Sequence, residues 1–195
     1  MNADRRLIEA IRARDARRVR AAISAGAKLE GEDGAKSALH LAAEVGSAEV
    51  IEALPRAAVK KMVNSFDAAG RTPLMYAAGK GNISTARALL EMGADVSAQN
   101  AFGDTALRVA ASDGTVDIAK LLLEAGGDPM LPGRMQLTPL DRARERHTPQ
   151  GRMIAALFMR ALEAKSPKLP RKGLKMAGGA RKSKQARRRR RIGVK

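Results

Sequence analysis

The sequence predicts an all-α fold in which helix pairs stack into a solenoid, and three observations indicate that class. Thr72, Thr105 and Thr138 follow one another at equal intervals of 33 residues. Apolar residues inside each interval recur at helical spacing and do not alternate as they would in a strand. Glycines recur at the positions where such helices would end. A period of this length is typical of proteins whose repeated units stack along a line.

Each unit is predicted to contain two helices. Thr72 stands directly before Pro73, which favours a helix start, because the hydroxyl can cap free amides and proline at the first helical position has no N–H to lose. Gly81 is expected to end the first helix, and Gly93 is expected to end the second. A polar loop containing glycine then leads to the next unit.

The repeat register divides a domain of residues 1–164 into about five units. Their approximate spans are 3–33, 34–67, 68–100, 101–133 and 134–162. The second unit is longer, because Ser37 precedes Thr72 by 35 residues instead of 33. We expect the two extra residues to lie within 55–62.

The segment Gly70–Leu74, Gly-Arg-Thr-Pro-Leu, resembles the opening of the ankyrin-repeat unit, Gly-x-Thr-Pro-Leu-His, which runs for 33 residues. The resemblance covers residues 3 to about 162 and is strongest over 68–129. It implies helix pairs joined by projecting hairpin loops. It also implies that His40, at the histidine position of the motif, makes hydrogen bonds between neighbouring turns.

The sequence departs from the family pattern at several positions. Arg14 and His147 stand where the family has a glycine between the helices, and Gln136 stands where it has the loop glycine. The second unit also lacks the Gly-Ala that should follow Leu54. Atypical residues are ordinary in the terminal units of a stack, whereas the irregular second unit is less easily explained.

The net charge of +17 lies mostly at the carboxyl end. Residues 163–195 contain 14 Lys and Arg against one Glu, while residues 1–162 contain 23 against 19 acidic residues. The segment 165–195 also has few large apolar residues and several prolines and glycines, so we expect it to be a disordered basic tail. The predicted domain itself is nearly balanced in charge.

The basic tail has three interpretations: a solubility segment, an electrostatic anchor for polyanions, or a targeting address. No aromatic residue follows position 162, so any contact with nucleic acid should be to phosphate and should not depend on base sequence. An anionic membrane is the other polyanion considered. The expected polyanion-binding residues are Arg181, Lys182, Lys184, Arg187, Arg188, Arg189, Arg190 and Arg191.

The sequence offers little for catalysis, so we expect no enzyme, no cofactor, no metal and no small-molecule substrate. Cysteine is absent, and the two histidines are His40, expected to be structural, and His147, expected to be exposed. The segment 31–37, Gly-Glu-Asp-Gly-Ala-Lys-Ser, superficially resembles the end of a phosphate-binding loop. However, alanine stands where that motif needs glycine before lysine, and no buried strand precedes it.

The resemblance implies that loop tips and first-helix faces form one concave binding side. Residues expected to face outward there and to bind a protein partner are Arg71, Met75, Lys80, Phe102, Asp104, Arg108 and Met135. Phe102 is the most distinctive, because aromatic and arginine side chains are enriched in interface hot spots. The alternative is that Phe102 packs down onto the neighbouring loop.

These observations favour a non-enzymatic protein–protein interaction adaptor whose repeats bind a protein and whose tail contacts polyanions or acts as an address. The alternative is a basic nucleic-acid-associated protein in which the repeats only present the tail. The amino terminus has no signal-peptide core, so we expect a cytoplasmic protein. We also expect the protein to be a monomer. The nucleus is the alternative location if the chain functions in a eukaryotic cell.

Overall fold

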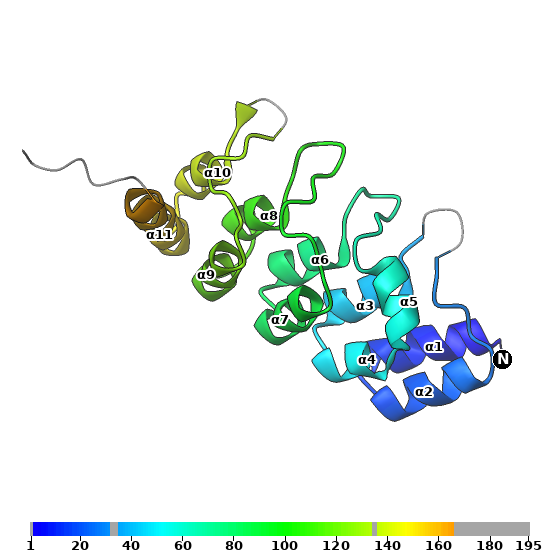
Figure 1. The fold of residues 1–195 in the computed structure, drawn as a ribbon. Coiled ribbons are helices and arrows are strands. Elements are labelled where there is room, and N and C mark those ends of the chain that lie inside the picture. Colours follow the sequence, from blue (N-terminus) through cyan, green and yellow to red (C-terminus); the bar gives the residue numbers. More distant parts are fainter. Residues whose placement is uncertain (1, 32–34, 134–135, 166–195) are drawn as a thin grey trace, which may run out of the picture.

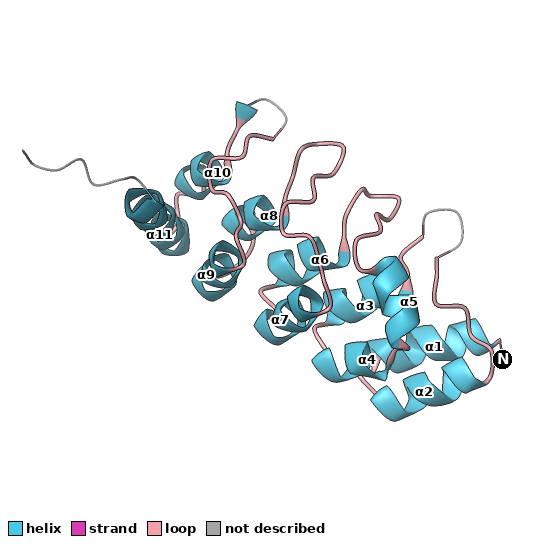
Figure 2. Cartoon of the chain, in the orientation of Figure 1, coloured by secondary structure: helices cyan, strands magenta, loops and turns pink. Residues whose placement is uncertain are grey.

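The computed structural model describes residues 2–31, 35–133 and 136–165. Within these ranges the chain forms helices joined by turns and loops, and no strand is present (Figure 2). The helices are α1 (Ala3–Arg12), α2 (Ala16–Ser24), α3 (Ala38–Val45), α4 (Ala48–Ala53), α5 (Arg56–Met62), α6 (Pro73–Lys80), α7 (Ile83–Glu91), α8 (Ala106–Ser112), α9 (Val116–Glu124), α10 (Pro139–Glu145) and α11 (Pro149–Lys165).

The helices stack as successive pairs along one direction (Figure 1). The first helices of the pairs are α1, α3, α6, α8 and α10, and their partners are α2, α4, α7, α9 and α11. The loops that precede α6 and α8 project from the same edge of the stack. The predicted all-α solenoid with projecting loops is therefore confirmed.

The threonines that define the period cap the first helices. Helices α6, α8 and α10 begin one residue after Thr72, Thr105 and Thr138. In each case the threonine hydroxyl accepts a hydrogen bond from the backbone N–H three residues later. This bond satisfies one of the amides that a helix start leaves free, which is why the threonine recurs at a fixed place.

The second unit is irregular because its second helix is broken. Helix α4 ends at Ala53, and the chain then becomes extended at Leu54 and Pro55 before α5 begins. Proline has no N–H to donate to the preceding turn, so the helix cannot continue through it. Helix α5 lies within the segment 55–62 in which the extra residues were expected. Its side chains Val59 and Met62 are buried and pack it against the stack.

Three described residues other than glycine have positive φ angles. They are Arg14 at 56°, Gln136 at 60° and His147 at 26°. At each of these three positions the sequence has another residue in place of the family's glycine. A left-handed backbone costs an ordinary residue about 1 to 2 kcal/mol, so the stack tolerates strain at each of them.

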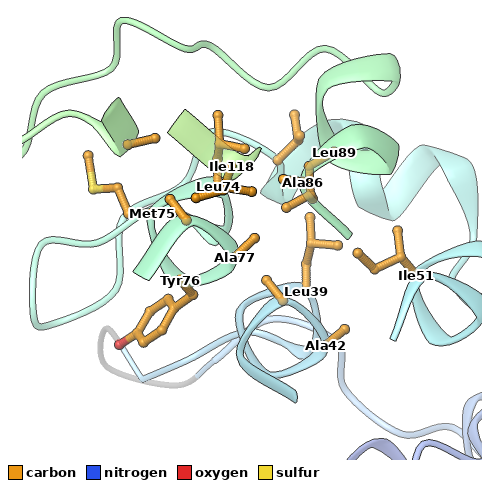
Figure 3. Close-up of a cluster of buried hydrophobic side chains, with 14 of the residues drawn as sticks. Leu39, Ala42, Ile51, Leu74, Met75, Tyr76, Ala77, Ala86, Leu89 and Ile118 are labelled. Atoms are coloured by element: carbon orange, nitrogen blue, oxygen red, sulfur yellow. The ribbon is translucent and has the colours of Figure 1, made fainter. Parts of the chain in front are cut away.

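One apolar core runs through all the helix pairs. Figure 3 shows the part of it around Leu39, Leu74 and Leu89. Leucine recurs at the same register position of successive first helices, as Leu39, Leu74, Leu107 and Leu140, and each is buried. Buried alanines flank these leucines and let neighbouring helices approach closely. Phe158 of α11 is fully buried at the carboxyl end of this core.

The last helix pair ends the described part of the chain. Helix α11 has 17 residues and is the longest of the described helices. It ends at Lys165, one residue beyond the expected end of the domain at 164. The remainder of the predicted tail, including the cationic residues from Arg181 to Arg191, lies outside the described residues.

Candidate protein-binding surface

In the loops before α6 and α8, one side chain each accepts two hydrogen bonds from backbone N–H groups of the loop tip. The Asp67 carboxylate accepts hydrogen bonds from the backbone N–H groups of Ala69 and Arg71, both at 3.0 Å. In the next unit, the Asn100 side-chain oxygen accepts from the N–H groups of Phe102 and Asp104, both at 2.9 Å. The two loops therefore present equivalent tips in a fixed conformation.

Several predicted surface residues are accessible at these loops and on the first helices. Phe102 is 50% exposed, and Arg71 and Lys80 are exposed as well. Asp104 is partly buried. Met135 lies outside the described residues, so its position remains a prediction.

Two residues that were expected to face outward are buried, and that expectation was wrong. Met75 is 1% exposed and Arg108 is 6% exposed. Both occupy the fourth position of the repeat motif, counted from the capping threonine, which is also the position of His40. A side chain at this position packs inside the stack, as the buried His40 shows in its own unit.

His40 joins its own helix to the loop that follows the pair. Its Nε2 lies 3.2 Å from the Ser65 carbonyl oxygen and 3.0 Å from that of Arg71, so this nitrogen carries the proton and donates. Its Nδ1 accepts from the Ser37 hydroxyl at 2.7 Å and from the Ser37 N–H at 3.3 Å. Both ring nitrogens are occupied, as the family resemblance implied, and the ring is unavailable as a general base.

The surroundings of His40 hold it neutral. Burial lowers the pKa of His40, and the carbonyl groups of Arg71 and Ser65 only partly offset that effect. The Tyr76 ring meets His40 edge-on at a centroid distance of 6.1 Å, and the Tyr76 hydroxyl donates to the Asp67 carboxylate at 2.7 Å. Burial alone would raise the pKa of Asp67, but its hydrogen bonds from the Arg71 N–H and Tyr76 bring that pKa below its ordinary value.

Arg108 occupies the same register position with a different set of contacts. It forms an ion pair with Asp104, one turn earlier in the sequence. Its guanidinium also lies beside the backbone of Gly133, where an added methyl group would approach the guanidinium to 3.3 Å. Its Nε is buried without a hydrogen-bond partner, and burial, followed by the charge of Arg142, lowers the pKa of Arg108.

One exposed aromatic residue was missed by the sequence interpretation. Phe66, in the loop before α6, is 48% exposed. The chain contains four aromatic residues, and the other two described with Phe66 and Phe102 are Tyr76 and Phe158, which are buried. Phe66 does not belong to the helical spacing of apolar residues and stands next to the loop residue Asp67. This position in the sequence could have indicated that its side chain is exposed.

No other kind of site is evident in the described part of the chain. No group of three or more His, Asp or Glu side chains there is placed to hold a metal ion. Among the helices of residues 2–31, 35–133 and 136–165, none combines the length and apolar character that crossing a bilayer requires.

The sequence was compared with known protein families. Residues 7–100 match the family description "Ankyrin repeats (3 copies)", and residues 102–134 match "Ankyrin repeat". The matches end before α10, so the last helix pair is recognised from the structure. Ankyrin repeats are generally protein–protein interaction modules. The matched segments cover most of the described stack, and the chain belongs to the ankyrin-repeat family.

Proposed function

We propose that this chain is a non-enzymatic adaptor that binds a protein partner along its projecting loops and the adjoining first helices. The observation that carries the proposal is the exposure of Phe66 and Phe102. Two of the four aromatic residues of the chain are about half exposed, and they lie in the loops before α6 and α8. Aromatic side chains bury a large area at a small cost in conformational entropy, which makes them effective anchors for a partner.

Charged residues in the loops and on the first helices add polar contacts to this surface. Arg71 and Lys80 are exposed cations, Asp113 is an exposed anion, and Asp104 is partly exposed beside Arg108. The hydrogen bonds of Asp67 and Asn100 fix the loops before any partner arrives. A fixed loop loses little entropy on binding, so pre-organisation favours affinity.

The second half of the adaptor proposal concerns residues 181–191. Their cations, namely Arg181, Lys182, Lys184 and Arg187 to Arg191, would hold polyanions by charge alone. The support for this part is the concentration of charge in the sequence. The repeats would then supply selectivity for a protein, and the basic segment would supply attachment to a polyanion.

The proposal is tested by capturing partners with the full-length chain and three full-length variants. Phe66→Ala/Phe102→Ala should lose the partners that bind the loops, with affinity reduced at least tenfold. Met153→Ala/Met159→Ala removes two exposed apolar side chains from α11 and is the matched control, which should retain them. Replacing Arg187 to Arg191 by Gln should leave the same partners bound.

Two results would overturn the proposal. If affinity changed less than twofold in the Phe66→Ala/Phe102→Ala variant while the helical signal was intact, the loops would not be the binding surface. If every partner depended on Arg187 to Arg191, the repeats would only present the basic segment, and the chain would be a nucleic-acid-associated protein of the alternative class.

A further inference from the structure

The positive charge of the predicted domain is concentrated in its first helix pair. Residues 1–30 contain eight Lys and Arg against four acidic residues, whereas residues 31–162 contain fifteen of each. Seven of the eight cations are arginines on or between α1 and α2. We refer to this set as the arginine belt, and it consists of Arg5, Arg6, Arg12, Arg14, Arg17, Arg18 and Arg20.

The arginine belt is accessible and largely unneutralised. All seven side chains are exposed. Within the described residues, only Arg5 and Arg18 form ion pairs, with Glu9 at 3.1 Å and Asp15 at 3.5 Å. Both pairs are at the surface, where an ion pair contributes little and exchanges readily for another anion. The guanidinium groups are therefore available to a ligand.

The arginines lie on more than one side of the helix pair. Arg5 and Arg12 are seven residues apart and share a stripe of α1 that faces away from buried Leu7. Arg17 and Arg20 are three residues apart on the exposed part of α2, and Arg17 lies on the side opposite buried Val19. The outer sides of both helices consequently carry cations.

Between those sides, a hollow follows the groove where α1 meets α2. Its volume is about 360 Å³, and Arg6 and Arg18 stand on its walls. Its remaining lining consists of Glu9 and the alanines Ala10, Ala21, Ala22 and Ala25. The hollow therefore carries one belt arginine from each helix, and α1 and α2 form the first pair of the described stack.

We propose that this helix pair binds the phosphate backbone of single-stranded nucleic acid, independently of residues 181–191. The guanidinium group is planar and matches phosphate oxygens with two parallel hydrogen bonds, which a lysine cannot offer. No aromatic residue precedes Phe66, so bases have nothing to stack on and base preference should be absent.

The distribution of the arginines favours a flexible polyanion over a rigid or flat one. Two packed helices are roughly 20 Å across, since each has a diameter of about 10 Å. Duplex DNA is stiff over about 150 base pairs, so it cannot bend around such a unit and can contact only one side of it. A bilayer also meets one side, and Ile8 is the only large apolar side chain of residues 2–30 that is exposed for it. A single strand can follow the belt around both helices.

The test uses the full-length chain with all eight cations of the proposed tail site, from Arg181 to Arg191, replaced by Gln. A fluorescent 20-nucleotide oligothymidine is titrated with it at 50 to 200 mM salt. In this background, Arg5→Gln/Arg12→Gln/Arg17→Gln/Arg20→Gln should weaken binding at least tenfold at 50 mM salt. Each lost contact should reduce the slope of log affinity against log salt by about 0.7, or about 2.8 for four contacts.

The matched control is Arg56→Gln/Arg87→Gln/Arg152→Gln/Arg160→Gln, which removes the same charge from exposed positions outside the first pair. It should change the slope by less than one contact, or about 0.7. Circular dichroism verifies that each variant keeps its helical signal. The smaller variants Arg5→Gln/Arg12→Gln and Arg17→Gln/Arg20→Gln should each reduce the slope by about 1.4, because the strand contacts both helices.

Four outcomes would overturn the proposal. The first is an equal loss in the control, which would mean that net charge alone governs binding. The second is a slope that changes in only one of the two smaller variants, which would indicate a ligand lying on one side. The third is binding to a 20-base-pair duplex that matches or exceeds binding to the single strand. The fourth is belt-dependent binding to phosphatidylserine vesicles with no binding to the oligonucleotide.

Discussion

His40 and Arg108 occupy the same register position in different units, yet the junctions around them are built differently. At the junction between α3 and α6, both His40 ring nitrogens have partners. At the junction between α8 and α10, Arg108 pairs with Asp104 but keeps a buried Nε without a partner. The repeat therefore fixes where this side chain points, and the neighbouring loop determines whether its polar atoms are satisfied.

The comparison suggests that the two junctions respond differently to the loss of their central polar residue. Removing a satisfied buried group leaves its former partners unpaired, which costs about 1 to 3 kcal/mol for each such group. Removing a poorly satisfied buried charge also removes a desolvation penalty. The changes below probe this difference and the apolar contacts that both junctions share.

The largest effects should be equal at the two junctions. Leu39→Ala and Leu107→Ala each delete a fully buried side chain at the same register position. Each should lower the free energy of unfolding by about 2 to 5 kcal/mol in urea. A loss below about 0.5 kcal/mol at either position would mean that the repeat register assigned to that unit is wrong.

The next effect should appear at the first junction alone. His40→Ala removes the donor to the Ser65 and Arg71 carbonyl oxygens, and should cost about 2 to 3 kcal/mol in urea unfolding. His147→Ala serves as the control, since His147 is exposed, and should stay within about 0.5 kcal/mol. Equal losses in the two histidine variants would contradict the structural role of His40.

Acidification should weaken the first junction. Because burial lowers the pKa of His40, the unfolded chain binds its proton more tightly than the folded chain does. The contribution of this residue to stability is therefore present above the ordinary histidine pKa of 6.5 and declines as the pH falls below it. Urea unfolding at pH 7.5 and pH 5.5 measures the decline, and His40→Gln should make it smaller.

The second junction should tolerate the loss of its charge. Arg108→Met replaces a buried guanidinium by an apolar side chain, as the natural Met75 does one unit earlier. We expect the free energy of unfolding to change by less than about 1 kcal/mol, because the lost ion pair and the relieved desolvation oppose each other, and because the Asp104 carboxylate left behind is 26% exposed to water. A loss above about 2 kcal/mol would show that the Asp104 ion pair is a principal support of this junction.

The smallest effect concerns the backbone of the second junction. Gln136 has a positive φ and stands 33 residues after Gly103, whose φ is 72°. Gln136→Gly should raise the free energy of unfolding by about 0.5 kcal/mol, because relief of strain exceeds the entropy that glycine loses on folding. The reciprocal change Gly103→Gln should lower it, and the same sign in both variants would contradict the argument from strain.

Sequence reasoning recovered the stack because its signals are local and periodic. Thr72 and its equivalents cap helices, and the residues in place of glycine at Arg14, Gln136 and His147 have the backbone that glycine would have adopted. The same reasoning misplaced Met75 and Arg108 because it assigned them to a surface while assigning His40, at the same register position, to the interior.

The rest of the candidate site depends on contacts that sequence periodicity does not encode. Phe66 is exposed because its loop is held by Asp67, Arg71 and Tyr76, which meet through the fold. The break between α4 and α5 follows from Pro55, but the burial of Val59 follows from the helices around it. Such contacts join residues from different units, and a pattern within one unit cannot reveal them.

Tyr76 gives the molecule a built-in optical probe. It is the only tyrosine, and the chain has no tryptophan, so near-ultraviolet absorbance beyond the phenylalanine band comes from this one ring. The ring is buried and its hydroxyl donates to Asp67, within the junction that His40 also joins. Tyrosine spectra therefore report the opening of a single junction, while the far-ultraviolet signal reports every helix. A difference between the two melting curves would show that the stack unfolds in steps.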